Sequence, residues 1–253
     1  TLEKAKTQQK QARKTLERIT AFLFKLFQIK LRYKEKREDY GIEIFEYFYL
    51  PWRSDKEFKA HYQLIQDFTL NPKSRLYTIY EMSKTYLQDN SSFVEVGTWK
   101  GGVTGLVSLT NKYKNIDYYA CDTFEGVVNS SEKDSFFKNT EYNDANYSDV
   151  KKVANVANCD VNIIKGIFPK SMELISLQKP ISFAHIDVDT YISAKESLEF
   201  ITNHALKGAV VILDDYGGWF TDGVTKLGNE LKEDKKFFVV PNHLGQMVIY
   251  VIN

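Results

Sequence analysis

The feature that most constrains the fold is a regular alternation of short apolar runs with segments of helical periodicity. The apolar runs occupy residues 93–97, 118–122, 160–165, 181–189, 208–215, 237–240 and 246–251. The helical segments lie between them, near residues 101–113, 148–157, 169–177, 191–204 and 223–233. Strands that are apolar along their whole length and alternate with helices are typical of a parallel sheet covered on both faces. The last two runs are joined by a short turn, which requires that pair to be antiparallel. The sequence therefore predicts an α/β fold with a mostly parallel sheet.

A helical cover segment is expected to precede this region, over residues 40–90. Ser54 and Glu57 have the spacing of a capping box, and apolar residues follow at helical intervals. A second helix is expected after Asn71 and Pro72. Neither helix carries an obvious chemical motif, so both are interpreted as cover for the sheet. Residues 91–253 then form the main domain.

Composition excludes several classes of protein. Hydrophobic residues make up 43% of the chain and charged residues 26%, which is typical of a packed globular protein. The net charge of +1 argues against nucleic acid as the main partner. Two cysteines, Cys121 and Cys159, are too few for a disulfide scaffold or a thiolate zinc site. With no apolar run long enough to span a bilayer and no secretory signal, we expect a cytoplasmic protein. Because the chain starts at Thr1, we also expect it to be part of a longer product.

Residues 1–39 form a separate, basic segment. They contain twelve basic and five acidic residues, a net charge of +7. Apolar residues alternate at spacings of four and three, which is typical of a coiled coil or a docked helix; they are Ala12, Leu16, Ile19, Leu23 and Leu26. Three interpretations stay open: a helix that joins subunits into a homo-oligomer or packs on the main domain, an amphipathic helix on the inner face of a membrane, and a linker. We favour the first.

Acidic residues follow the predicted strands, at the edge where α/β sheets bind ligands. Asp187 and Asp189 end one strand, and Asp214 and Asp215 end the next. Four carboxylates in this position repel one another unless a cation compensates them. Oxygen ligands without a nearby cysteine favour Mg²⁺, Ca²⁺ or Mn²⁺ over zinc. The sequence therefore predicts a site for a divalent cation.

The first strand leads into a glycine-rich turn. Gly97 and Gly101 allow a tight turn and a close approach of the backbone to a ligand. Three residues separate them, unlike the dinucleotide pattern, which disfavours an NAD-dependent oxidoreductase. Asp122 ends the second strand, where an acid accepts hydrogen bonds from the hydroxyl groups of a ribose.

Five motifs in matching order resemble the macrocin O-methyltransferase family. They are EVGTWKGG at 95–102, CDTFEG at 121–126, GIFP at 166–169, HIDVD at 185–189 and LDDY at 213–216. The resemblance covers roughly residues 50–253. It implies a Rossmann-like class I methyltransferase fold with a seven-stranded sheet. It also implies Mg²⁺-dependent transfer of a methyl group from S-adenosylmethionine to a sugar hydroxyl.

The resemblance further implies roles for individual residues. The metal ligands would be Asp187, Asp214 and Asp215, and Asp189 would be the catalytic base. The residues implied to form the S-adenosylmethionine site are Glu95, Gly97, Thr98, Gly101, Asp122 and Gly166.

The acceptor is less well defined than the donor. The loop over residues 123–147 matches the family only at its start, and we expect this loop to cover the acceptor. The sugar, its hydroxyl group and the choice between an antibiotic and a cell-surface polysaccharide stay open. Two alternative functions also stay open: a metal-dependent methyltransferase for a catechol-like diol, and a non-catalytic sugar-binding or assembly module.

Overall fold

The computed structural model describes residues 50–173 and 175–252. The predicted basic helix over residues 1–39 lies outside this range, so its roles in oligomerisation or membrane contact stay predictions. A bilayer-crossing helix is not found among the described residues, since none joins sufficient length with sufficient apolarity.

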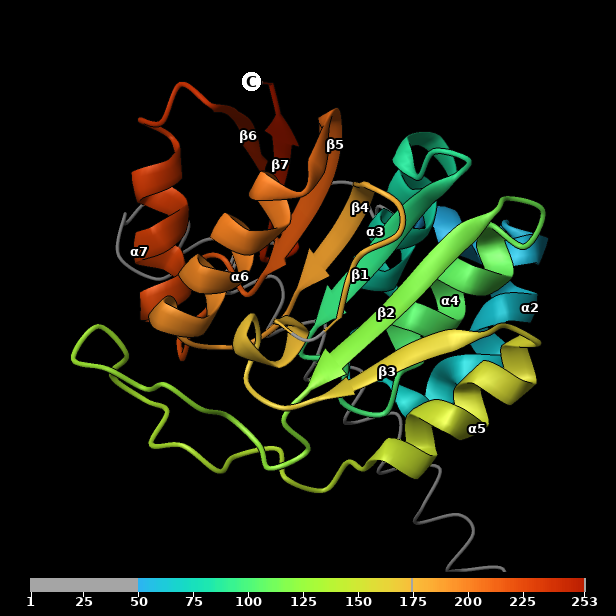
Figure 1. The fold of residues 1–253 in the computed structure, drawn as a ribbon, viewed down its shortest axis with the longest axis horizontal. Coiled ribbons are helices and arrows are strands. Elements are labelled where there is room, and N and C mark those ends of the chain that lie inside the picture. Colours follow the sequence, from blue (N-terminus) through green and yellow to red (C-terminus); the bar gives the residue numbers. More distant parts are fainter. Residues whose placement is uncertain (1–49, 174, 253) are drawn as a thin grey trace, which may run out of the picture. The chain divides into compact units, whose positions relative to one another are not determined.

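A seven-stranded sheet forms the centre of the described region, as the sequence predicts (Figure 1). The strands are β1 (Ser91–Val96), β2 (Ile116–Asp122), β3 (Val161–Lys165), β4 (Ile181–Ile186), β5 (Ala205–Asp214), β6 (Phe237–Pro241) and β7 (Gln246–Val251). Their spatial order is β3-β2-β1-β4-β5-β7-β6. Strand β7 is antiparallel to both β5 and β6, which confirms the predicted antiparallel end of the sheet.

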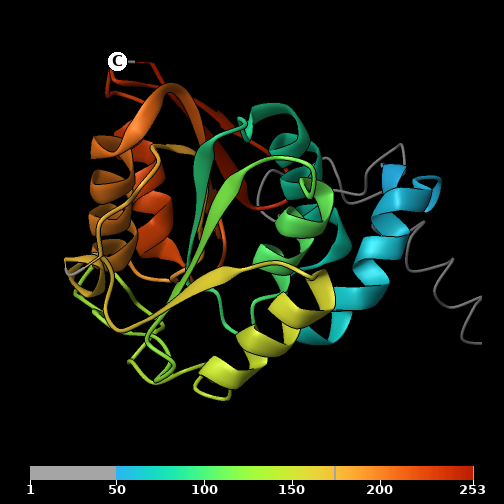
Figure 2. The same cartoon turned by 45° about the vertical axis from the view of Figure 1, so that its right-hand side comes forward.

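Helices cover both faces of this sheet (Figures 1 and 2). One face carries α2 (Lys56–Ile65), α3 (Lys73–Tyr86), α4 (Gly102–Thr110) and α5 (Tyr147–Ala157), and the other carries α6 (Tyr191–Asn203) and α7 (Asp222–Leu231). Three short 3₁₀ helices complete the set: η1 (Pro51–Arg53), η2 (Gln66–Phe68) and η3 (Lys170–Met172).

Two apolar cores result, because successive side chains of a strand point to opposite faces. Phe93 of β1 packs in the core beneath α2, α3 and α4, whereas its neighbour Val94 packs in the core beneath α6 and α7. Both side chains are fully buried. Each such burial stabilises the fold by roughly 1.5–3 kcal/mol, so the strands are held on both faces.

Three local expectations were wrong. Helix α2 is capped by Asp55, whose carboxylate accepts a hydrogen bond from the Phe58 amide at 2.9 Å, and not by Ser54. Among the described residues of the 169–177 segment, only Lys170–Met172 form a helix, η3, and most backbone bonds there run from residue i+3 to i, as in a brief 3₁₀ connector. Strand β4 ends at Ile186, so Asp187 and Asp189 lie in the loop after it.

The carboxyl ends of the five consecutively paired parallel strands lie at one edge of the sheet, and the loops that follow them meet there. The longest connects β2 to α5 over residues 123–146. It is pinned against the α6 and α7 side of the fold. The Asp134 carboxylate accepts a hydrogen bond from the Tyr191 amide at 2.9 Å, and the Ser135 amide donates to Asp222 at 3.0 Å. The loop is therefore fixed to the amino-terminal ends of α6 and α7.

Candidate active site

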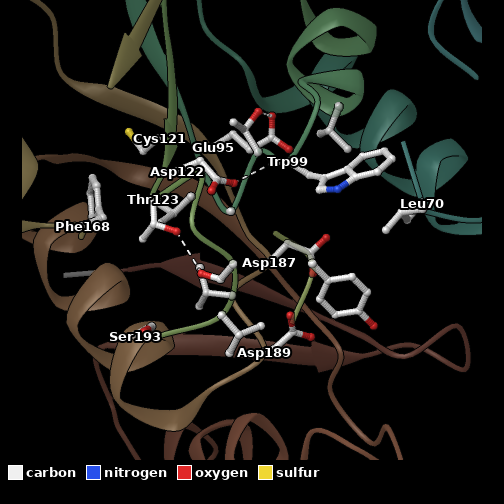
Figure 3. Close-up of a pocket in the computed structure, with 18 of the residues that line it drawn as sticks. Leu70, Glu95, Trp99, Cys121, Asp122, Thr123, Phe168, Asp187, Asp189 and Ser193 are labelled. Carbon is white, nitrogen blue, oxygen red and sulfur yellow. Dashed lines mark hydrogen bonds between the residues drawn. The ribbon is translucent and has the colours of Figure 1, made fainter. Parts of the chain in front are cut away.

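A pocket of about 280 Å³ lies at the carboxyl ends of the central strands (Figure 3). Glu95 and Asp122, from the β1 and β2 side, lie at one end of the view, and Asp187 and Asp189 lie across from them. Every residue predicted for the S-adenosylmethionine site lines this pocket except Gly101. Of the four predicted metal-site acids, Asp187, Asp189 and Asp215 line it.

The turn from β1 into α4 is shaped by its glycines. Gly97 has φ +84°, and a Cβ atom there would lie 1.8 Å from the backbone oxygen of Asp187. Gly101 has φ +90° and caps α4. Two neighbouring strand ends therefore approach more closely than any side chain at residue 97 permits.

Glu95 organises this turn from inside. Its residue is 1% exposed. Its carboxylate accepts hydrogen bonds from the Thr98 hydroxyl at 2.9 Å, the Thr104 amide at 2.9 Å and the Thr104 hydroxyl. Thr98 is buried as well. These contacts fit a role in shaping the predicted cofactor site.

Asp122 is held rigidly at the end of β2. One carboxylate oxygen accepts from the Trp99 amide and the other from the Phe124 amide, each at 2.7 Å. Burial raises the pKa of Asp122, and these backbone bonds oppose the increase. Gly166, with φ +132°, lies beside it and donates its amide to the Asp122 backbone oxygen at 2.9 Å. Each carboxylate oxygen has a further lone pair, so the predicted role of Asp122 in binding a ribose stays a prediction that this geometry permits.

The opposite side of the pocket gathers acidic groups. One ligand atom from each of His185, Asp187 and Asp214 lies within 4.8 Å of the others. Burial, followed by repulsion from Asp214 and Asp215, raises the pKa of Asp187 well above its usual value. Crowded carboxylates of this kind fit a hard divalent cation, which would relieve the repulsion. Of the predicted ligands, the structure brings Asp187 and Asp214 together in this cluster, and Asp215 lies next along the chain.

Asp189 and Asp215 form a second pair beside this cluster. Both adopt a left-handed backbone, with φ +62° and +65°. Burial raises the pKa of Asp189 to about 8, with contributions from the charge of Asp215 and from a hydrogen bond between the two carboxyl groups. Because β4 has already ended, the expected strand alternation does not orient Asp189; the left-handed turn does.

His185 lies between the two sides of the pocket. It is fully buried, with Nε2 3.0 Å from Asp214 Oδ2 and Nδ1 3.4 Å from Glu95 Oε1. Burial lowers its pKa, but hydrogen bonds with Asp214 and Glu95 outweigh this and raise the pKa to about 10. The ring therefore lies between the glycine turn and the acidic cluster and contacts a carboxylate of each. Sequence reasoning interpreted it only as a core histidine.

Sequence reasoning also missed two residues at the start of α3. The side-chain nitrogen of Asn71, Nδ2, donates a hydrogen bond to Asp187 Oδ2 at 2.9 Å. Arg75 Nη1 lies 2.8 Å from Oδ1 of both Asp214 and Asp215. A basic residue in the first turn of a helix opposes the helix dipole, but Lys73 shares this feature, so the sequence does not distinguish Arg75.

The β2–α5 loop adds Tyr142 to the pocket lining. Its residue is 54% exposed, and its pKa is raised by burial and then by the charges of Asp189, Asp215 and Asp187. By contrast, Tyr216 packs against α7, where its hydroxyl donates to Asn229 Oδ1 at 2.8 Å. Tyr142 is therefore the aromatic residue of this loop that faces the acidic groups.

Comparison with known proteins bears on the family. A family model described as macrocin-O-methyltransferase (TylF) matches residues 57–250. No curated protein matches the sequence.

Solved methyltransferases share the fold at low sequence identity. The O-methyltransferase NovP is 16% identical, with a TM-score of 0.61 over 74% of this chain and 83% of NovP. The calicheamicin methyltransferase CalS11 is 14% identical, with a TM-score of 0.59 over 85% of this chain and 98% of CalS11. An O-methyltransferase from Bacillus cereus, solved in complex with SAH, is 13% identical, with a TM-score of 0.53 over 79% of this chain and 91% of that one.

These structures support the class I methyltransferase fold, and the family model covers most of the chain, including all five motifs. The chain therefore belongs to the macrocin-O-methyltransferase family, and the prediction of an S-adenosylmethionine-dependent O-methyltransferase is confirmed at the level of the family.

Proposed function

We propose that the protein transfers a methyl group from S-adenosylmethionine to a hydroxyl group of a sugar-containing acceptor, with Mg²⁺ at the acidic cluster. The observation that carries this proposal is the arrangement of the pocket. A glycine turn and Asp122 form one wall, and Asp187, Asp189 and Asp215 form the other. NovP and CalS11, which share the fold, act in the same general class of chemistry, since both are described as methyltransferases.

The donor would bind along the β1 and β2 side. The backbone at Gly97 and Thr98, which line the pocket, would border its methionine end, and the fixed carboxylate of Asp122 would accept hydrogen bonds from the ribose. Gly166 borders the same side of the pocket, where the adenine ring of S-adenosylmethionine would lie. When bound, S-adenosylmethionine supplies a methyl group on a positively charged sulfur, which needs only in-line placement against the acceptor oxygen.

The metal would be held by Asp187, Asp214 and Asp215. Mg²⁺ bound there supplies a Lewis acid that lowers the pKa of an acceptor hydroxyl. These residues fit it because their carboxylates are crowded, so that burial and repulsion from Asp214 and Asp215 raise the pKa of Asp187. The side-chain Nδ2 of Asn71 donates a hydrogen bond to Asp187, and this bond fixes the orientation of the Asp187 carboxylate.

Asp189 would accept the proton of the acceptor hydroxyl. Asp189 accepts a proton only in its ionised form, and its pKa is raised to about 8. The fraction that can act as a base would therefore increase as the pH rises through 8, and a cation bound beside it would favour the ionised form. As the new bond between the acceptor oxygen and the methyl carbon forms, the bond between that carbon and sulfur breaks, and its electrons remain on sulfur. The products are the methyl ether, S-adenosylhomocysteine and a proton on Asp189.

Asp189→Asn tests this assignment. We expect turnover to fall by about 10²-fold or more, since general base catalysis contributes about 10²–10⁴-fold. Binding of S-adenosylhomocysteine should be unchanged by calorimetry, because Asp189 lies across the pocket from Glu95 and Asp122. The assay follows transfer of a labelled methyl group to a panel of glycosides with vicinal hydroxyl groups, in parallel with catechols. Asp160→Asn, at an exposed position on the surface, is the matched control.

Three outcomes would contradict parts of the proposal. An active Asp189→Asn variant removes Asp189 from the role of base. Full turnover in the presence of a chelator removes the metal. Methylation of catechols and of no glycoside replaces the sugar acceptor with an aromatic diol.

A further inference from the structure

Arg75 is the one arginine of the described residues that contacts the acidic cluster. It lies on α3, 140 residues before Asp215 in sequence, and its Nη1 atom is 2.8 Å from Oδ1 of both Asp214 and Asp215. Its side chain is only 20% exposed. A guanidinium group does not lose its proton in proteins. The proposed metal site therefore contains a permanent positive charge.

The guanidinium group is enclosed by a second element. Its Nε donates a hydrogen bond to the Leu244 backbone oxygen at 2.8 Å, in the turn between β6 and β7. The next residue is Gly245, where a Cβ atom would lie 2.5 Å from Arg75 Nη2. A side chain at residue 245 would push the guanidinium out of its position. Arg75 is thus held between α3, β5 and the β6–β7 turn.

Carboxyl groups outnumber the guanidinium group in this cluster. Burial lowers the pKa of Arg75, and the charges of Asp214, Asp215 and Asp187 outweigh this effect and raise it. Three carboxyl groups therefore act on one permanent positive charge. A divalent cation that binds these carboxyl groups therefore enters a site where Asp214 and Asp215 already have a positively charged partner, Arg75.

We infer that Arg75 is a positioning residue that neutralises and orients Asp214 and Asp215 before an ion binds, and that a divalent cation binds against its charge. This inference rests on the proposed metal site. Two opposite effects follow from removing the charge. The ion-free protein loses stability, because Asp214 and Asp215 then repel each other without compensation. The affinity for a divalent cation rises, because a like charge has been removed.

Arg75→Gln and Arg75→Lys separate these effects, with Mn²⁺ alone as the probe. The melting temperature is measured in chelator, and the dissociation constant for Mn²⁺ is measured from the electron paramagnetic resonance signal of the free ion. For Arg75→Gln we expect a melting temperature lower by roughly 3–6 °C and Mn²⁺ binding about tenfold tighter. Arg75→Lys keeps the charge and loses the fork, so it should bind Mn²⁺ within about twofold of wild type while also losing stability.

Lys84→Gln is the matched control. Lys84 lies at the other end of the same helix and pairs with Glu57 at 3.1 Å, so the variant removes the same charge from α3 away from the cluster. We expect it to bind Mn²⁺ as the wild type does. Tighter binding in Lys84→Gln equal to that in Arg75→Gln would show a general effect of charge and overturn the inference.

Failure of the inference and failure of the metal site are distinguishable. If the wild type binds Mn²⁺ and Asp187→Asn abolishes this binding, the metal site stands. Unchanged or weaker binding by Arg75→Gln then overturns the inference alone. If the wild type binds no Mn²⁺, the proposed metal site and the inference are both wrong. Should Arg75→Gln fail to fold, weaker binding by Arg75→Lys overturns the inference, since the charge is retained.

Discussion

At the scale of single residues, the distance between the two sides of the pocket depends on residue 97 being a glycine, which has no side chain. The Asp187 backbone oxygen occupies the space that a Cβ atom of residue 97 would need, at 1.8 Å. We therefore expect Gly97→Ala to lower the free energy of unfolding by about 2–4 kcal/mol, from steric overlap combined with the left-handed backbone. Denaturant unfolding followed by circular dichroism measures this loss.

Gly208→Ala is the control for backbone conformation alone. Gly208 has the same φ of +84°, and nothing lies within 4 Å of a Cβ atom placed there. We expect a cost of about 1 kcal/mol, which is the strain of a left-handed backbone without overlap. Equal losses at the two positions would show that close approach of the Asp187 backbone does not constrain Gly97.

At the scale of elements, the β2–α5 loop supplies the cap that α6 lacks. Thr190 precedes α6 and makes no side-chain capping bond. Asp134 instead accepts from the Tyr191 amide at 2.9 Å, with a negative charge at the positive end of the helix. We expect Asp134→Ala to lower stability by about 1–3 kcal/mol, because a buried amide loses its partner. The loop should also be cleaved faster in limited proteolysis.

Glu132→Ala is the matched control in the same loop. Glu132 is exposed, so the variant removes an equal charge without unpairing a buried group. Its proteolysis rate and unfolding free energy should equal those of the wild type. If Asp134→Ala behaves in the same way, the loop is held by other contacts, such as the hydrogen bond from the Thr190 hydroxyl to Val128.

At the scale of the whole molecule, the donor wall and the acidic cluster should bind their ligands separately. S-adenosylhomocysteine and Mg²⁺ should each raise the melting temperature, since a ligand at about 100 times its Kd stabilises a protein by about 2.7 kcal/mol. In Asp122→Asn, the same rise in melting temperature should need about tenfold or more S-adenosylhomocysteine, because hydrogen bonds to a charged group are lost. Its response to Mg²⁺ should be unchanged. Differential scanning fluorimetry measures both, and loss of the Mg²⁺ response in this variant would contradict separate binding.

The sequence predicted the sheet well because its signal is local. The central strands β1 and β4 are buried along their whole length, which produces mostly apolar runs, and each parallel strand ends at or just before a glycine or an acid. The wrong predictions concern positions where the sequence permits two local structures, and apolar periodicity does not distinguish between them. Asp55 and Ser54 are both good caps, and only the backbone decides between them. The segment over 169–177 is apolar enough for a helix, yet forms only η3.

The sequence by itself determined the fold class, the edge of the sheet where the pocket lies and the acids that gather there. These follow from the strand pattern, since the parallel strand ends meet at one edge whatever the details of packing. Only the tertiary structure decided which basic side chains contact those acids. Arg75 and His185 reach them from α3 and β4, and no spacing in the sequence connects Arg75 with Asp215 across 140 residues. Charge balance in a buried site depends on distance in space, and packing of the whole domain sets that distance.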